Sequence, residues 1–89
     1  MDKISNLRKS IDAIDDKLLE LIISRADLVK EIGNLKNQSK MPVVDTERES
    51  EIFKKIMSKA KESGLDQSAI KKIWLSLIEI SYKIEGDIK

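Results

Sequence analysis

The sequence predicts an all-α protein with three helices. Apolar residues recur at steps of three and four along three segments, which are separated by one stretch with the only proline and another with a glycine. Such steps place apolar side chains on one face of a helix. Charged residues make up 37% of the chain and aromatic residues 3%, a composition typical of long amphipathic helices. We expect a single domain, because 89 residues leave no room for a second.

The inventory of reactive side chains excludes several classes of enzyme. The chain has no histidine and no cysteine, so it holds no Ser-His-Asp triad, no zinc site built on those residues and no disulfide. A formal net charge of +1 argues against a protein that mainly binds nucleic acid. No apolar run is long enough to span a membrane, and residues 1–5 lack the apolar segment of a signal peptide. We expect a soluble cytoplasmic protein without a metal.

The first helix is predicted from about Lys3 to Gln38. Its apolar positions follow a heptad-like pattern in which an arginine fills position 25. Gly33 is unfavourable inside a helix and therefore suggests close packing against another helix. The loop from Ser39 to Val44 contains Pro42 and ends the helix. The apolar positions are Ile4, Leu7, Ile11, Ile14, Leu18, Leu21, Leu28, Ile32 and Leu35.

The second helix is predicted to begin at Asp45 or Thr46, since both residue types are good N-caps. Thr46 and Glu49 also have the spacing of a capping box. Gly64 is expected just beyond the C-terminal end of this helix, where a left-handed residue is common. The apolar face consists of Ile52, Phe53, Ile56, Met57 and Ala60.

The third helix is predicted to begin after Asp66 or Ser68, either of which can cap it. Two polar residues interrupt its apolar face, Ser81 and Glu85. The face as a whole consists of Ile70, Ile73, Trp74, Leu77, Ile78, Ser81, Ile84, Glu85 and Ile88.

The length of the first helix predicts a homodimer. About 36 residues give a helix roughly 54 Å long, whereas a compact chain of this size has a diameter of about 30 Å. The first helix therefore extends beyond any core that its own chain can build, and an apolar stripe exposed on that scale needs a cover. The simplest cover is a second copy, with the long helices paired across a two-fold axis.

Basic residues lie on or beside the apolar stripe of the first helix. Arg25 lies between Leu21 and Leu28, and Lys36 follows it by eleven residues. That spacing rotates the two side chains by only about 20° and separates them by about 16 Å, so both heads can bracket one small anion. Arg8 lies about 25 Å of helix from Arg25, too far for the two to share a small molecule within one chain. If Arg8 serves that site, it comes from the other subunit.

Polar residues also lie near the apolar faces of the other two helices. Arg48 and Glu49 are in the first turn of the second helix, and Ser81 and Glu85 are four residues apart on the third. Each has a simpler interpretation, such as ion pairing across a dimer for Arg25, helix capping for Glu49 or a backbone-bonded core serine for Ser81. Because burying unpaired charges is costly, the whole set favours a pocket for a small dianion.

These residues are similar to those of a known family. The most specific parts are an arginine and a lysine eleven residues apart, Asp-x-x-Arg-Glu after a proline, and Ser-x-x-x-Glu near the end. The combination resembles the all-helical chorismate mutases. The resemblance implies that residues 1–89 are a single chorismate mutase domain with three helices per subunit, in an intertwined homodimeric helical bundle. The matching stretches are Leu7-Arg8, Ile11–Asp15, Leu18–Leu21, Arg25, Lys36, Pro42–Glu49, Ser81 and Glu85.

The resemblance also implies a reaction, the Claisen rearrangement of chorismate to prephenate on the route to phenylalanine and tyrosine. A pericyclic step needs no nucleophile, metal, cofactor or proton shuttle, which suits a chain without histidine and cysteine. It needs a flexible dianion held in its chair-like reactive conformation, with donors directed at the ether oxygen. We expect a free-standing, unregulated mutase, because the chain has no obvious place for a dehydratase, dehydrogenase or sensing domain.

The roles that the resemblance implies begin with the basic residues of the first helix. Arg25 would hold one carboxylate of chorismate, and Arg8 would reach the same site from the partner subunit. Lys36 would donate to the ether oxygen and to the neighbouring carboxylate. A role of Arg8 from the partner subunit agrees with the separation of about 25 Å along the helix between Arg8 and Arg25, which follows from helix geometry alone.

The remaining implied roles belong to the second and third helices. Arg48 and Ser81 would help to hold the ring carboxylate, and Glu49 and the backbone at Asp45 would bind the ring hydroxyl. Glu85 stands where many relatives have a glutamine whose NH₂ group donates to the ether oxygen. Since an ionised carboxylate has no proton to donate, Glu85 must be protonated to act in this way. Burial favours the protonated form and Lys36 opposes it. Because only the protonated form can donate, our hypothesis is that activity is best in the acidic range and falls as Glu85 ionises.

Two alternative functions remain open from the sequence. One is an isochorismate pyruvate-lyase on the same fold, although Arg48, Glu49 and the carboxyl or amide at position 85 favour the mutase. The other is a helical dimerisation module without chemistry, which would bind no dianion and would lose no stability from Arg25→Leu.

Overall fold

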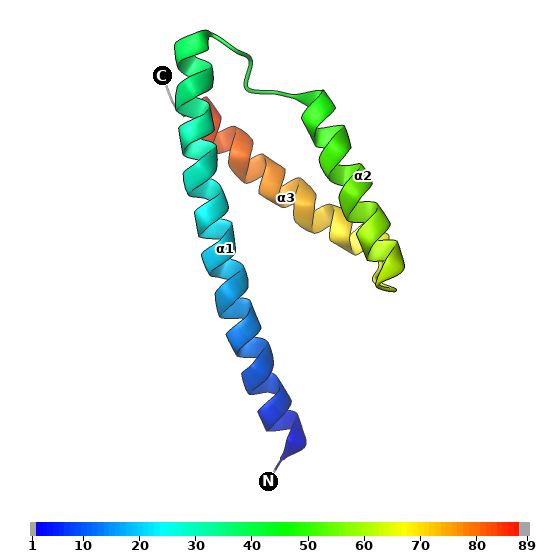
Figure 1. Ribbon diagram of the computed structural model, residues 1–89. Helices are drawn as coiled ribbons and strands as arrows, with labels where there is room; N and C mark the ends of the chain where they lie inside the picture. Colours follow the sequence, from blue (N-terminus) through cyan, green and yellow to red (C-terminus); the bar gives the residue numbers. More distant parts are fainter. Residues whose placement is uncertain (1, 88–89) are drawn as a thin grey trace.

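The computed structural model describes residues 2–87, which form three α-helices and no strand. The helices are α1 (Lys3–Ser39), α2 (Thr46–Glu62) and α3 (Gln67–Gly86) (Figure 1). The prediction of an all-α chain with three helices is confirmed, and α1 ends one residue later than expected. Ile88, which the sequence pattern assigned to the third apolar face, lies outside the described residues.

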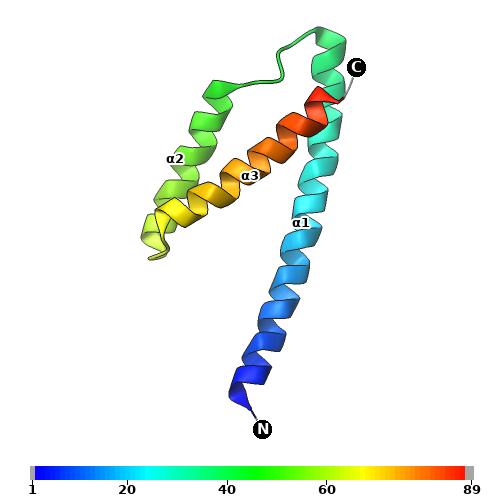
Figure 2. The same ribbon diagram turned by 180° about the vertical axis from the view of Figure 1, so that it is seen from behind.

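α3 is the helix that connects the other two in space. Both α1 and α2 pack against α3, and they do not pack against each other. Figures 1 and 2 show α3 crossing the C-terminal half of α1, while the N-terminal half of α1 extends alone. The radius of gyration is 16.5 Å and the long dimension is 58 Å, whereas a compact chain of this length would have a radius of about 12 Å. The expected projection of the first helix is confirmed.

The two ends of α1 are closed by local hydrogen bonds. At the N-terminus the Asp2 side chain accepts from the backbone N–H of Ile4 at 3.0 Å. At the C-terminus Lys40 has a left-handed backbone with φ of 57°, and the N–H of Met41 donates to the carbonyl of Lys36 at 2.8 Å. A left-handed residue after the last turn reverses the chain direction, and here it leads the chain from α1 into the loop toward α2.

Asp45, rather than Thr46, is the N-cap of α2. Its carboxylate accepts from the backbone N–H of Arg48 at 3.0 Å. Thr46 is already the first helical residue, so the expected capping box between Thr46 and Glu49 is wrong. The reason is that Asp45 satisfies the N–H at the third helical position, and that position is occupied by Arg48.

The turn between α2 and α3 has the residues that the sequence pattern predicted. Gly64 follows the C-cap Ser63 with φ of +71°, a conformation that is costly for residues with a Cβ. Asp66 then caps α3 by accepting from the N–H of Ser68 at 3.0 Å. The tight turn places the end of α2 against the start of α3, and the two helices diverge from there toward the start of α2 and the end of α3 (Figures 1 and 2).

The apolar core of the chain is small. Its buried apolar side chains are Val29, Ala60, Leu77 and Ile78. Gly33 is buried as well, and the close helix packing that its presence in the helix suggested stays a prediction.

Most of the apolar stripe on α1 is exposed in this chain. Leu7 is 64% exposed, Ile14 58% and Leu21 67%. Exposed apolar surface of this extent marks an interaction site. None of the helices within residues 2–87 is both long and apolar enough to cross a membrane.

Candidate active site

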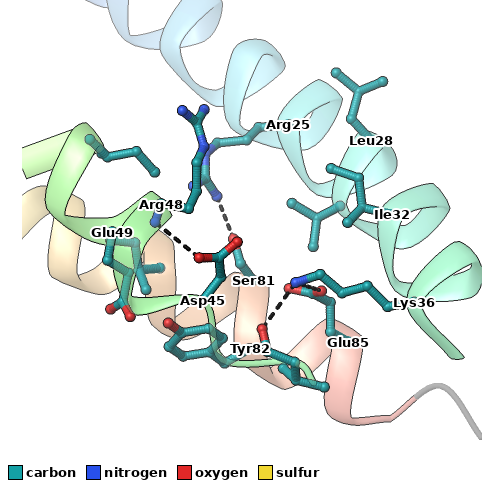
Figure 3. A pocket seen from close by; sticks show the side chains of 14 residues that line it. Arg25, Leu28, Ile32, Lys36, Asp45, Arg48, Glu49, Ser81, Tyr82 and Glu85 are labelled. Carbon is teal, nitrogen blue, oxygen red and sulfur yellow. Dashed lines mark hydrogen bonds and ion pairs between the residues drawn. The ribbon is translucent and has the colours of Figure 1, made fainter. Parts of the chain in front are cut away.

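A pocket of about 450 Å³ lies between the C-terminal half of α1, the start of α2 and the end of α3. That volume falls within the range of sites for small molecules. Apolar side chains from all three helices and the loop form part of its wall, and basic and acidic side chains enter between them (Figure 3). The lining residues are Arg25, Leu28, Val29, Ile32, Lys36, Val43, Asp45, Arg48, Glu49, Ile52, Ile78, Ser81, Tyr82 and Glu85.

Arg25 enters the pocket from α1 and is held by neutral oxygen atoms. One guanidinium nitrogen, Nη1, donates to the Ser81 hydroxyl at 2.6 Å and to the Leu77 carbonyl at 3.2 Å. Ser81 donates in turn to the same carbonyl at 3.1 Å, a bond one helical turn back along α3. Within residues 2–87 Arg25 forms no ion pair with a carboxylate. Its contacts therefore orient the guanidinium while leaving its charge available for an anion.

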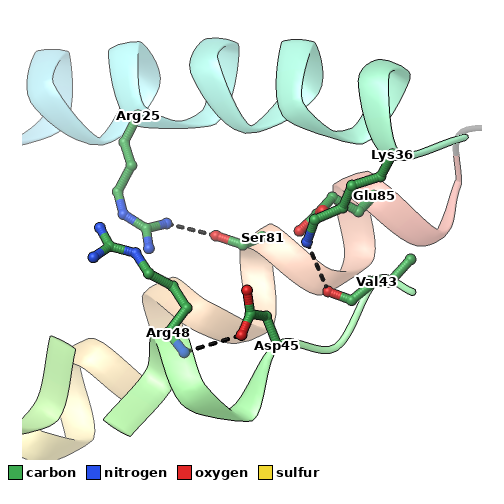
Figure 4. Close-up of polar contacts among 7 residues, drawn as sticks. All are labelled: Arg25, Lys36, Val43, Asp45, Arg48, Ser81 and Glu85. Atoms are coloured by element: carbon green, nitrogen blue, oxygen red, sulfur yellow. Dashed lines mark hydrogen bonds and ion pairs between the residues drawn. The ribbon is translucent and has the colours of Figure 1, made fainter. Parts of the chain in front are cut away.

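Arg48 brings a second guanidinium to the same end of the pocket. Figures 3 and 4 show the side chains of Arg25 and Arg48 next to each other. The only ion pair of Arg48 among the described residues is with Glu51 at 3.4 Å, where both side chains are 65% exposed. Exposed pairs of that kind contribute little energy, so they hold the arginine only weakly. Two adjacent like charges are favourable when an anion lies between them.

Lys36 lies at the other end of the pocket, next to Glu85. Its Nζ is 2.9 Å from Glu85 Oε1 and donates to the Val43 carbonyl at 3.1 Å (Figure 4). The separation from Glu85 is that of an ion pair, but the angle does not make a hydrogen bond, and Oε1 has no hydrogen-bond partner among the described residues. Both side chains are largely buried, at 17% and 7% exposure. Since an ammonium carries three donors, Lys36 retains capacity for a ligand.

Tyr82 is the pocket residue that the sequence analysis missed. Its hydroxyl oxygen is buried and makes no hydrogen bond with a described residue. Loss of hydration, followed by the Glu49 carboxylate and then Glu85, raises the pKa of Tyr82 to about 12, while the Asp45 backbone opposes the shift. Because the hydroxyl has no hydrogen-bond partner among the described residues, Glu49 raises the pKa of Tyr82 as a nearby negative charge and not as a bonded acceptor.

A model of one protein family matches residues 7–86 of the chain, and that family is described as chorismate mutase type II. The chain belongs to this family. The match covers all three helices apart from the first residues of α1, and it includes the whole pocket.

Individual relatives support the same assignment. The chain is 40% identical over 79 residues to a chorismate mutase of Methanocaldococcus jannaschii, covering 89% of this chain and 80% of the relative. It is 38% identical over 92 residues to a bifunctional chorismate mutase/prephenate dehydratase of Aquifex aeolicus, covering 100% of this chain and 25% of the relative. A T-protein of Haemophilus influenzae is 28% identical over 86 residues, or 97% of this chain and 23% of that protein. The chain therefore spans about a quarter of these two longer relatives.

The pocket brings together seven of the eight site residues that were predicted from the sequence. Arg8 is the exception, because it lies on the N-terminal half of α1, which extends away from the pocket. The roles of all eight residues stay predictions. The seven in the pocket are Arg25, Lys36, Asp45, Arg48, Glu49, Ser81 and Glu85.

A signal for Tyr82 was present in the sequence. Tyr82 lies three residues before Glu85 and four after Ile78, so all three share a face of α3. Because an aromatic ring suits an apolar face, the apolar pattern alone does not single out the Tyr82 hydroxyl.

The raised pKa of Tyr82 predicts a loss of stability in alkali. The folded pKa of about 12 exceeds the ordinary value of 10.0, so the folded state favours the neutral form of Tyr82. The stability that depends on this neutral form is complete below pH 10 and is lost as the pH rises toward 12. We expect the free energy of unfolding in urea to fall more steeply over this range for the wild-type protein than for Tyr82→Phe. Lysines titrate in the same range and affect both proteins, so equal slopes would contradict the prediction.

Proposed function

We propose that this chain is a chorismate mutase that converts chorismate to prephenate without a cofactor, as a single domain that works in the cytoplasm as a homodimer. Its family makes it an isomerase of aromatic amino acid biosynthesis. The observation that carries the proposal is the charge of Arg25, which is directed into the pocket and is not neutralised by any described carboxylate. That arrangement suits a substrate that supplies its own negative charge.

The two ends of the pocket suit the two carboxylates of chorismate. Arg25 and Arg48 form one cationic end, and Lys36 forms the other (Figure 4). A ligand held at both ends loses most of its conformational freedom, which favours the folded reactive conformer over the extended ones. Ser81 positions Arg25 by accepting from its guanidinium, and its hydroxyl would donate to the same carboxylate by turning away from the Leu77 carbonyl.

Lys36 and Glu85 would act on the bond that breaks. As the C–O bond lengthens, negative charge develops on the ether oxygen, and donors already directed at it stabilise the transition state. Lys36 is held by the Val43 carbonyl and lies beside Glu85, so both side chains present their heads to one region of the pocket. In its protonated form Glu85 is a second donor there.

The opposite wall of the pocket would bind the ring hydroxyl. Glu49 lies in the first turn of α2, and Asp45 precedes that turn. The Asp45 carboxylate is engaged by the N–H of Arg48, so its backbone and the Glu49 carboxylate remain for the substrate.

A homodimer would complete the site. The exposed stripe of α1 continues for several turns beyond the contact with α3, and a second copy in an intertwined bundle would cover it. In that arrangement the N-terminal half of each α1 lies against the pocket of the other subunit and delivers Arg8 in trans. The distance along α1 supports this, because Arg8 and Arg25 of one chain are about 25 Å apart.

Neither alternative function is favoured by the comparisons. The family and the relative from M. jannaschii are chorismate mutases. An isochorismate pyruvate-lyase would be revealed by assaying chorismate and isochorismate side by side. A module without chemistry would leave both compounds unchanged.

Removal of Lys36 tests the electrostatic role directly. Purified wild-type protein should deplete the chorismate absorbance band and form prephenate, and Lys36→Ala should lose about 2.7–4 kcal/mol of transition-state stabilisation, as loss of one oxyanion donor does elsewhere. Steady-state kinetics measure this loss in kcat. Lys40→Ala is the matched control, since Lys40 is exposed and lies outside the pocket. A Lys36→Ala variant that kept more than about a tenth of the wild-type kcat would rule out this role.

The protonation of Glu85 predicts the pH dependence of the reaction. Glu85 can donate to the ether oxygen only while it carries a proton, whereas Glu85→Gln carries an amide donor at every pH. We therefore expect kcat of Glu85→Gln to depend less on pH than kcat of the wild-type enzyme. The hypothesis is wrong if the two proteins share one pH–rate profile.

Mixed dimers test whether Arg8 acts in trans. Arg8→Ala and Arg25→Ala homodimers should each be nearly inactive. When the two variants are unfolded together and refolded at equal amounts, about half of the dimers are mixed and each has one intact site, so about a quarter of wild-type activity should return. An Arg8 that served its own subunit would give no recovery.

A further inference from the structure

Tyr82 and Glu49 present an unsatisfied donor and an unsatisfied acceptor next to each other on one wall of the pocket. Tyr82 is the only tyrosine of the chain and enters the pocket from α3, whereas Glu49 comes from the first turn of α2. Figure 3 shows the Tyr82 hydroxyl directed toward the Glu49 carboxylate. Glu49 is half-buried and forms no side-chain hydrogen bond or ion pair among the described residues.

The other acidic groups around the hydroxyl are already engaged. The Asp45 carboxylate accepts from the N–H of Arg48, and Glu85 lies 2.9 Å from the Lys36 ammonium. Glu49 is therefore the neighbouring acidic group whose carboxylate has neither a side-chain hydrogen bond nor an ion pair among the described residues. A buried hydroxyl without a partner is costly, so a small adjustment that forms this bond is favoured when a ligand excludes water from the pocket.

A tyrosine is suited to this position because it donates without carrying charge. Its raised pKa of about 12 keeps the hydroxyl protonated at any pH at which the enzyme works. A carboxylate with one oxygen occupied by a neutral donor keeps its other oxygen as an acceptor for a substrate hydroxyl. The same carboxylate without that donor is more strongly negative and would favour a substrate ammonium group over a hydroxyl.

We propose that Tyr82 is a positioning residue that donates to Glu49 in the occupied pocket and thereby makes this wall select a ring hydroxyl over a ring amine. The inference rests on the proposed mutase function and deepens it, because it assigns the selectivity at the ring hydroxyl to a pair of residues. Tyr82 acts through Glu49 and not on the bonds that form and break.

Kinetics of Tyr82→Phe, which keeps the aromatic ring, test the proposal. Loss of a hydrogen bond to a charged group corresponds to about a tenfold effect, which we expect in the KM for chorismate with kcat changed by less than about twofold. The ratio of kcat/KM for chorismate to that for its analogue with an amine in place of the ring hydroxyl should fall by about tenfold. An unchanged KM, or equal effects on both substrates, would overturn the proposal.

A double-mutant cycle with Glu49→Gln separates this role from a structural one. In the Glu49→Gln background Tyr82→Phe should change KM by less than about twofold, because the partner charge is absent. Additive effects of the two substitutions would overturn the proposal. A wild-type protein that does not convert chorismate would instead refute the proposed function, so the two failures are distinguishable.

A spectroscopic measurement keeps the test independent of the folding of Tyr82→Phe. Because the chain has one tyrosine, ¹³Cζ-labelled tyrosine gives one NMR resonance that reports on the Tyr82 hydroxyl alone. Saturation of the wild-type enzyme with prephenate should shift this resonance, and the shift should be smaller in Glu49→Gln, whose neutral amide oxygen is a weaker acceptor. The same shift in both proteins, or none in the wild type, would overturn the proposal.

Discussion

Arg25 places a permanent positive charge in the apolar seam of α1, and the rest of the pocket is organised around that charge. Arginine cannot lose its proton in a protein, so the cost of its partial burial must be offset by its contacts. The structure provides a hydroxyl and a carbonyl of α3, which fix the direction of the guanidinium without neutralising it. α3 thereby contacts α1 through these hydrogen bonds as well as through its apolar face.

Other basic residues of the site are likewise held by contacts that leave their charge available to a ligand. Lys36 is oriented by the Val43 carbonyl, while the Arg48 side chain pairs with no described residue except the exposed Glu51. A rearrangement that forms no bond to the protein depends on such preorganised charge, since neither a nucleophile nor a proton shuttle takes part. An inventory without histidine or cysteine is therefore compatible with catalysis in this family.

Helical periodicity and capping chemistry made most of the fold predictable. The three helices, the left-handed Gly64 and the Asp66 cap all follow from local rules. The start of α2 was harder, because two adjacent residues can cap and only the backbone decides between Asp45 and Thr46. In the site, charged residues on apolar faces could be predicted because burying an unpaired charge is energetically costly. Tyr82 could not be predicted in this way, because its aromatic ring suits an apolar face although it carries a hydroxyl. The role of Arg8 stays a prediction, because it depends on a second chain, which the length of the first helix predicts.

Lys36 donates to the main-chain carbonyl of Val43. The loop can therefore keep this contact when the residue at position 43 changes, but not when the length of the loop changes. A main-chain oxygen is supplied by every amino acid, so substitutions at position 43 leave this acceptor in place. An inserted or deleted residue between the left-handed Lys40 and the Asp45 cap would instead move the carbonyl away from the ammonium. This contact therefore constrains the number of residues in the loop and not the side chain at position 43.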